Sequence, residues 1–369
     1  MNHIRQLDSL RALAVLLVVV SHWVPKLNIL PWGEIGVDVF FVLSGFLITG
    51  ILLEKRRLVN ELHLGRVFVL RNFIARRTLR IFPIYYLMIL FHYMIADQTG
   101  TSVRENLPYY LTYTSNVLFY LNNSLDGIVS HFWSLAVEEQ FYLFWPWVIL
   151  LVPERSIKWV FGVFIILGIG FGMLIPGMGG MLTPACFDAF AIGGGLAFMK
   201  HHDRVLNCSE KRILNSLTMV SVILLVFFPF LKDSLFSFVH IRLIVSVLTF
   251  RAIYYCLYEN DNRLVNHVLG FRALGWLGKV SYGVYIYHTA IPWTFRKVSD
   301  ALAGLGWNAS PIYGLLPSSL HNDLDLLLKF IALLLVSWLS WVLVENPINN
   351  LKKYFDDNIP SPKTANLNE

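Results

Sequence analysis

The 369-residue sequence is poor in charged residues: Asp, Glu, Lys and Arg make up 15% of it, whereas 56% is hydrophobic. Soluble globular domains carry about 25% charged residues, so this shortage excludes an ordinary soluble domain. The net charge of +6 does not indicate a nucleic-acid partner, because membrane proteins retain Lys and Arg on their cytoplasmic loops. Internal repeats and low-complexity tracts are also lacking. The sequence predicts one domain, residues 1–355, followed by a polar tail, residues 356–369.

Cysteine is scarce as well. Cys186, Cys208 and Cys256 are far apart and form no CxxC pair, which argues against a zinc site and against a disulfide framework. The histidines fall on different apolar stretches, without the spacing of metal ligands. The sequence therefore predicts no metal centre.

Long apolar stretches are abundant. A helix that crosses a bilayer needs roughly 20 mostly apolar residues. Stretches bounded by charged residues, proline and glycine predict an all-α integral membrane protein with about ten transmembrane helices. They lie near residues 7–24, 35–54, 80–96, 134–152, 157–176, 187–199, 214–231, 239–257, 276–295 and 325–344. The longest segments between them are 55–79, 97–133 and 296–324.

The first stretch looks like the core of a signal peptide, but no small-x-small cleavage site follows it, so we expect an uncleaved transmembrane helix. With the N-terminus inside, cytoplasmic segments hold roughly four times as many Lys and Arg residues as the outer loops. Both termini, and the tail 356–369, are therefore expected in the cytoplasm. The short stretch 187–199 contains Gly193-Gly194-Gly195, which indicates either close helix packing or a broken helix.

The first stretch also carries two ionisable residues, Arg11 and His22. An ionisable residue inside a span is costly and is therefore a functional candidate. The spacing returns both side chains to nearly one face, about 16 Å apart along the helix axis. One helix would then present a cation near the cytoplasmic end and an imidazole near the outer end to one interior path. The alternative is that both side chains simply reach the membrane interfaces.

A carboxylate lies level with that imidazole. Asp38 is within a turn of the outer end of the second stretch. It could orient His22 or stabilise its positive charge, as a carboxylate does for the imidazole base of other catalytic sites. It could equally cap its own helix.

The segment that follows is rich in arginine. Arg76, Arg77 and Arg80 fall around one helical turn, close enough to share an anionic ligand, and Arg71 precedes them. Guanidinium groups bind phosphate well. The alternative is an anchor on anionic lipid at the cytoplasmic face.

Further ionisable residues occur in later spans. Glu138 and Glu139 are adjacent inside the fourth stretch, where two carboxylates are costly, so at least one should face a polar cavity. His288 lies in the outer half of the ninth stretch, Arg251 lies deep in the eighth, and Glu345 ends the tenth at the cytoplasmic face.

Six short segments connect these residues into one pattern that runs from end to end of the chain. They are Leu7-Asp8-Ser9-Leu10-Arg11-Ala12 with His22; Gly36-Val37-Asp38 through Gly45-Phe46-Leu47; Arg77-Thr78-Leu79-Arg80-Ile81-Phe82-Pro83; His131-Phe132-Trp133-Ser134-Leu135 through Glu139-Gln140-Phe141-Tyr142; Ser281-Tyr282 through His288; and Glu345-Asn346-Pro347. In this order they resemble acyltransferase family 3, membrane acyltransferases that include bacterial O-antigen and nodulation-factor O-acetylases. The spacing between Arg11 and His22 is the hallmark of that family.

The resemblance implies a multi-pass O-acyltransferase of the bacterial inner (cytoplasmic) membrane. It would move an acyl group, acetyl by family frequency, from cytoplasmic acyl-CoA to a hydroxyl of an extracytoplasmic glycan such as O-antigen, exopolysaccharide or a lipid-linked sugar. Some relatives carry an extra C-terminal periplasmic hydrolase-like domain. Because this sequence stops after its tenth span, the chemistry is expected in the membrane domain or is completed by another protein.

The resemblance also suggests roles for individual residues. A sugar hydroxyl must lose its proton as it attacks, and imidazole titrates in the right range, so His22 is the expected general base. An acyl-histidine intermediate is the alternative. Arg76, Arg77 and Arg80 would hold the phosphates of CoA, and Arg11 would line the path inward. Glu139, Glu138 and Asp38 are candidates to orient His22. The expected substrate-binding residues are His131, Trp133, Ser134, Glu138, Ser281, Tyr282 and His288.

A membrane transporter or flippase for a glycan or an acyl carrier is the competing interpretation. Many spans with buried charges fit that class too, although the sequence has no inverted repeat and no paired broken helices in two halves. The sequence leaves open the acyl group, the acceptor hydroxyl and the oligomeric state, a homo-oligomer included.

Overall fold

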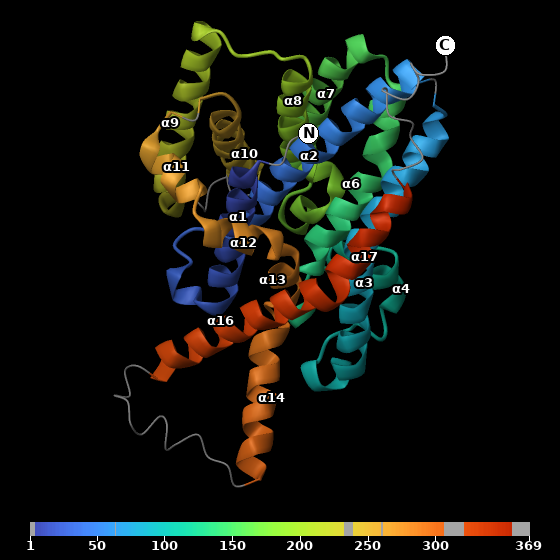
Figure 1. Ribbon diagram of the computed structural model, residues 1–369. Coiled ribbons are helices and arrows are strands. Elements are labelled where there is room, and N and C mark those ends of the chain that lie inside the picture. Colours follow the sequence, from blue (N-terminus) through green and yellow to red (C-terminus); the bar gives the residue numbers. More distant parts are fainter. Residues whose placement is uncertain (1–3, 63, 232–238, 260, 306–320, 356–369) are drawn as a thin grey trace.

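The computed structural model describes residues 4–62, 64–231, 239–259, 261–305 and 321–355, and every regular element in these ranges is helical. Seven of the described helices are long and apolar enough to cross a membrane, which supports the predicted all-α multi-pass membrane protein. They correspond to α1 (Arg5–Trp23), α2 (Trp32–Leu62), α3 (Arg66–Thr99), α7 (Glu154–Leu174), α9 (Cys208–Leu231), α10 (Val239–Tyr254) and α16 (His321–Ser340) with the turns that continue it to Phe355. Figure 1 shows α1 and α2 in the middle of this bundle.

Three of the ten expected spans are not among these seven. Helix α6 (Phe132–Leu151) has the length of a span, but Glu138, Glu139 and Gln140 lie inside it. Helix α8 (Phe187–His201) has 15 residues, about 22 Å of helix, against a hydrocarbon core of about 30 Å.

The expected span 276–295 is not one helix, and that part of the prediction was wrong. It is divided among α12 (Arg272–Lys279), α13 (Ser281–Tyr287) and α14 (Ala290–Gly304). Ser281 Oγ donates to the carbonyl of Gly278 at 2.8 Å and so supplies a hydrogen-bond donor to a carbonyl at the end of α12. His288 Nδ1 does the same for Tyr285 O at 2.5 Å, where α13 ends.

The segment 55–79, expected to lie between spans, is largely helical. Helix α2 continues to Leu62, and α3 already begins at Arg66. The boundary was misplaced because the charged residues after position 54 do not end a helix; the break comes at Gly65, which precedes α3 with an extended backbone. The arginine-rich segment is therefore held in a fixed helical register.

Helices α2 and α8 cross at glycines. A Cβ atom on Gly45 would lie 2.1 Å from the carbonyl oxygen of Phe190, and a Cβ atom on Gly193 would lie 2.0 Å from that of Val42. Neither position has room for a side chain, so the two backbones pack directly against each other. Because α8 is continuous through 193–195, the close-packing interpretation of the glycine run is right and the broken helix is not.

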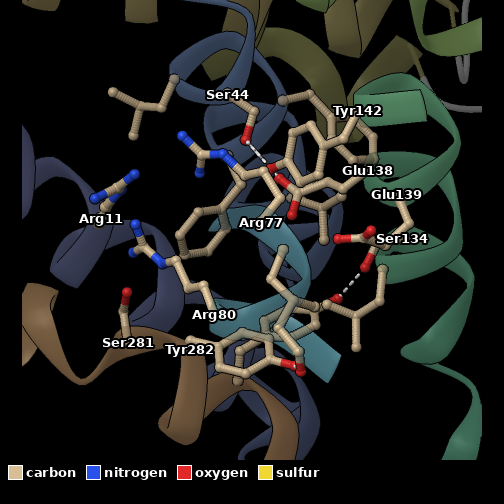
Figure 2. Close-up of a pocket in the computed structure, with 17 residues that line it drawn as sticks. Arg11, Ser44, Arg77, Arg80, Ser134, Glu138, Glu139, Tyr142, Ser281 and Tyr282 are labelled. Atoms are coloured by element: carbon tan, nitrogen blue, oxygen red, sulfur yellow. Dashed lines mark hydrogen bonds between the residues drawn. The ribbon is translucent and has the colours of Figure 1, made fainter. Parts of the chain in front are cut away.

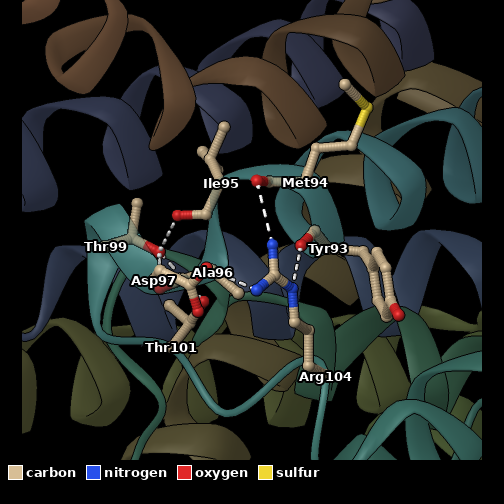
Figure 3. Close-up of polar contacts among 8 residues, drawn as sticks. All are labelled: Tyr93, Met94, Ile95, Ala96, Asp97, Thr99, Thr101 and Arg104. Carbon is tan, nitrogen blue, oxygen red and sulfur yellow. Dashed lines mark hydrogen bonds and ion pairs between the residues drawn. The ribbon is translucent and has the colours of Figure 1, made fainter.

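Side chains from the following loop fix the outer end of α3 (Figure 3). Arg104 donates from Nε to the carbonyl of Tyr93 at 2.8 Å and forms an ion pair with Asp97. Further along, Asp126 accepts hydrogen bonds from the backbone N–H and hydroxyl of Ser102. The loop that carries short helices α4 (Leu107–Leu111) and α5 (Ser115–Asn122) is thereby tied to α3, and it delivers the chain to the start of α6 in a defined position.

Candidate active site

A central cavity of about 90 Å³ lies where α1, α2, α3, α6 and α13 meet. Figure 2 shows polar side chains from these five helices converging on it. Three carry a positive charge and two are carboxylates. The polar residues that line it are Arg11, Ser44, Arg77, Arg80, Ser134, Glu138, Glu139, Tyr142, Ser281, Tyr282 and Tyr285.

A second, basic cavity of about 550 Å³ adjoins the first. Arg11, Arg77 and Arg80 line both cavities, so the three guanidinium groups stand at the junction. Arg76 and Lys352 line the basic cavity as well. Together with Lys55, the cavity presents six cations against two carboxylates, Asp8 and Glu54. Guanidinium groups donate paired hydrogen bonds to phosphate, so this excess of cations suits a ligand with several phosphate groups.

Both ends of the described chain lie on the side of this basic cavity. Ile4, just before α1, and Lys352, near the last described residue, are part of its lining. The first and last described turns of the chain therefore meet at one cavity, and the expected location of both termini in the cytoplasm stays a prediction.

The carboxylates of the central cavity have different surroundings. Glu138 Oε1 accepts a hydrogen bond from Ser44 Oγ at 2.7 Å. The hydroxyls of Ser44 and Tyr142 lie 3.0 Å apart; because Ser44 uses its proton on Glu138, Tyr142 donates to it. The neighbouring Glu139 Oε1 is buried and has no hydrogen-bond partner among the described residues. A buried, unpartnered acceptor that faces a cavity is suited to receive a donor from a ligand.

A third, outer cavity of about 180 Å³ contains His22 near the other end of α1. His22 Nδ1 lies 2.9 Å from the carbonyl oxygen of Val18, which can only accept, so Nδ1 carries a proton; in the neutral imidazole the lone pair is then on Nε2. Val37 and Tyr285 line both the outer and the central cavity. The three cavities therefore follow one another along α1.

Two more imidazoles lie beside His22. Its ring centroid is 4.8 Å from that of His288, and the His288 centroid is 5.0 Å from that of His131. Trp23 Nε1 donates to the carbonyl of His288 at 2.8 Å and so joins the end of α1 to the end of α13. Burial, and then the neighbouring His288, lower the pKa of His131, which lies in the turn before α6. His131 is therefore neutral near pH 7, with a buried Nε2 that has no described partner.

The structure brings the predicted arginines together and separates them from His22. Arg11, Arg76, Arg77 and Arg80 all line the basic cavity, whereas His22 lines the outer one. Arg11 thus lines the basic and central cavities, and His22, an exposed residue, lines the outer cavity at the other end of the series. Their chemical roles stay predictions.

The expected orienters of His22 lie elsewhere. Asp38 Oδ1 accepts from Arg242 Nε at 2.9 Å, and both side chains are about 95% buried or more. Glu138 and Glu139 line the central cavity, not the outer one. The hydrogen bond that fixes the His22 ring comes from the backbone of its own helix, at Val18. The surroundings of His22 thus differ from the carboxylate–imidazole pair that we expected.

The predicted substrate-binding residues divide between two cavities. His131 and Trp133 line the outer cavity, and His288 packs between His22 and His131. The others line the central cavity: Ser134, Glu138, Ser281 and Tyr282.

Several residues of this region escaped the sequence analysis, among them Ser44, Tyr285, Arg242, Lys352 and Glu34, a carboxylate that lines the outer cavity with His22. Ser44 could have been found, because Val37, Phe41 and Ser44 repeat with helical spacing along the face of α2 that lines the central cavity. Arg242 could have been found as an ionisable residue inside an apolar stretch. Lys352 gave no signal, because it lies in a basic segment that looks like a membrane flank.

Comparison with known proteins identifies the family of this chain. The sequence model of the family described as "Acyltransferase domain" matches residues 4–345. The chain is 28% identical over 394 residues to the peptidoglycan O-acetyltransferase OatA of Listeria monocytogenes, which covers 96% of this chain and 57% of the relative. It is 27% identical to the putative peptidoglycan O-acetyltransferase YrhL of Bacillus subtilis, over 94% of this chain and 55% of the relative.

A putative O-acetyltransferase of Staphylococcus aureus is 26% identical, over 79% of this chain and 51% of the relative. The chain therefore spans about half the length of the curated relatives that it matches. Among solved structures, none matches this chain significantly.

Proposed function

Since this chain belongs to the acyltransferase domain family, we propose that it is a membrane O-acyltransferase that moves an acyl group, acetyl in the first place, from cytoplasmic acyl-CoA to a glycan hydroxyl outside the membrane. The observation that carries the proposal is the series of cavities along α1, with three arginines at one junction and His22 at the far end. Two relatives named for peptidoglycan favour a cell-wall glycan as acceptor and the bacterial cytoplasmic membrane as location.

The donor would enter through the basic cavity. Its phosphates would bind the guanidinium groups of Arg11, Arg77 and Arg80, which leaves the long, thin pantetheine arm to carry the thioester through the central cavity to its boundary with the outer cavity, at Val37 and Tyr285. Glu139, with its unpartnered oxygen, would accept a hydrogen bond from an amide N–H of that arm.

The acceptor would enter from the outer cavity, where His22 Nε2 takes the proton of the attacking hydroxyl. The hydroxyl oxygen forms a bond to the thioester carbonyl carbon, the carbon–sulfur bond breaks, and the CoA thiolate is protonated by the imidazolium or by water. Transfer through an acyl group on His22 balances equally well. A burst of CoA release that precedes glycan acylation would identify that route.

The test uses the full chain, purified and reconstituted, with radiolabelled acetyl-CoA and a peptidoglycan fragment. We expect label on the glycan, and we expect His22→Ala to lower the transfer rate by about 10²–10⁴-fold, the usual contribution of a general base. His202→Ala is the matched control, because that imidazole is exposed and pairs with Glu154 away from the cavities. Movement of glycan across the vesicle without any transfer of label would identify a transporter instead.

A further inference from the structure

The cations of the basic cavity lie at two levels, an inner level beside the central cavity and an outer level away from it. Binding of the thioester alone does not explain the cations of the outer level. Arg11, Arg77 and Arg80 form the inner level, because they also line the central cavity. Arg76 and Lys352 line only the basic cavity and form the outer level. A ligand with charges at two distances from its reactive end would match this division.

Lys352 reaches the cavity from the far end of the chain. It lies in the last described turn, Asn350–Phe355, which packs against α3. The guanidinium groups of Arg80, Arg77 and Arg76 all act on its ammonium group through space. Lys352 forms no ion pair among the described residues, and cations outnumber carboxylates in the lining of the cavity. Such a cluster is unfavourable unless an anion is present.

CoA carries its charge in two groups. The diphosphate follows the pantetheine arm, and the 3′-phosphate on the ribose is farther from the thioester. The 3′-phosphate is a monoester and carries a charge of about −1.5 to −2 near pH 7. With the diphosphate at the inner level, the pantetheine arm would extend through the central cavity and the 3′-phosphate would fall at the outer level.

We propose that Lys352, with Arg76 beside it, forms a subsite for the 3′-phosphate of the CoA donor. This inference rests on the proposed function, since it assumes acyl-CoA as the donor. The C-terminal turn of the domain then contributes to donor selection. The enzyme binds CoA more tightly than carriers that share the pantetheine arm and lack the 3′-phosphate.

The experiment measures binding of CoA and of 3′-dephospho-CoA to the detergent-solubilised full chain by calorimetry, which requires no turnover. We expect CoA to bind about ten- to a hundredfold more tightly than dephospho-CoA, as for the loss of a charged hydrogen-bond partner. Lys352→Gln should remove most of that preference by weakening CoA binding alone, and Lys352→Arg should keep it. Lys353→Gln is the matched control, because Lys353 is exposed beside the ring of Tyr354 and does not line the cavity.

Equal binding of the two ligands by the wild type would overturn the proposal, as would an equal loss of both in Lys352→Gln or no binding of either. These outcomes are separate from the transfer assay. Label transfer with equal binding would reject the subsite and keep the acyltransferase. A 3′-phosphate preference without label transfer would keep the subsite and reject the acyltransferase.

Discussion

Replacing Arg242 with methionine should destabilise the outer half of the bundle by about 3–5 kcal/mol, the usual cost of leaving one partner of a buried ion pair alone. The Arg242 side chain is 5% exposed and its Nε donates to Asp38 at 2.9 Å. It also donates to the carbonyls of Ala185 at 2.6 Å and Gly180 at 3.0 Å. Methionine fills similar space but offers no donor, so a buried carboxylate and two carbonyls would lose their partner.

The effect should also reach the outer cavity. Gly180 and Ala185 belong to the short turns before α8, and Met181 between them lines the cavity that contains His22. We therefore expect Arg242→Met to lower the midpoint of thermal unfolding by several degrees, on the order of 5–10 °C, and to reduce acceptor use more than donor binding.

A double-mutant cycle tests the cause. Asp38→Asn combined with Arg242→Met removes the buried charge as well as its partner, so the double variant should lose less stability than the two single losses added together. Arg251→Met is the control, because its pair with Glu259 is more exposed, at 24% and 20%. Thermal unfolding of purified protein, followed by a fluorescent thiol probe or light scattering, measures all four variants. An unchanged midpoint for Arg242→Met would refute the reasoning.

The remaining predictions concern helix packing and donor binding. Gly193→Val should lower the unfolding midpoint, because its side chain would overlap the backbone of α2, whereas Gly195→Ala, with open space around it, should not; equal midpoints for the two would contradict the crossing described above. Arg80→Gln should raise the apparent KM for acetyl-CoA about tenfold or more with a smaller effect on kcat, measured by CoA release. If Arg80→Gln lowered only the expression level of the protein, Arg80 would instead act as an anchor on anionic lipid.

The sequence was sufficient for those parts of the fold and site that depend on local periodicity. Arg11 and His22 line cavities that follow one another along α1 because a helix of 3.6 residues per turn brings them to one face. The arginine cluster followed in the same way from the spacing of Arg77 and Arg80. These contacts need only the geometry of one helix.

Long-range pairing could not be predicted. The partner of Asp38 lies 204 positions away, and the imidazole beside His22 belongs to a different helix. The break between α12 and α13 also depends on a distant segment, because Gly278 packs against the backbone of Asp8 so closely that a Cβ atom would lie 1.9 Å from its carbonyl oxygen. Apolar content alone made residues 276–295 look like a continuous span, since nothing in that stretch reveals what it packs against.

The shared wall of Val37 and Tyr285 has a consequence for the energised membrane. Val37 is apolar, and the Tyr285 hydroxyl already bonds to Ser134 and to the carbonyl of His131, so this partition offers water few vacant polar partners. A passage lined by basic and acidic groups at both ends would otherwise conduct protons and dissipate the electrochemical gradient. A partition with so few vacant polar groups would therefore oppose proton leakage between the two cavities.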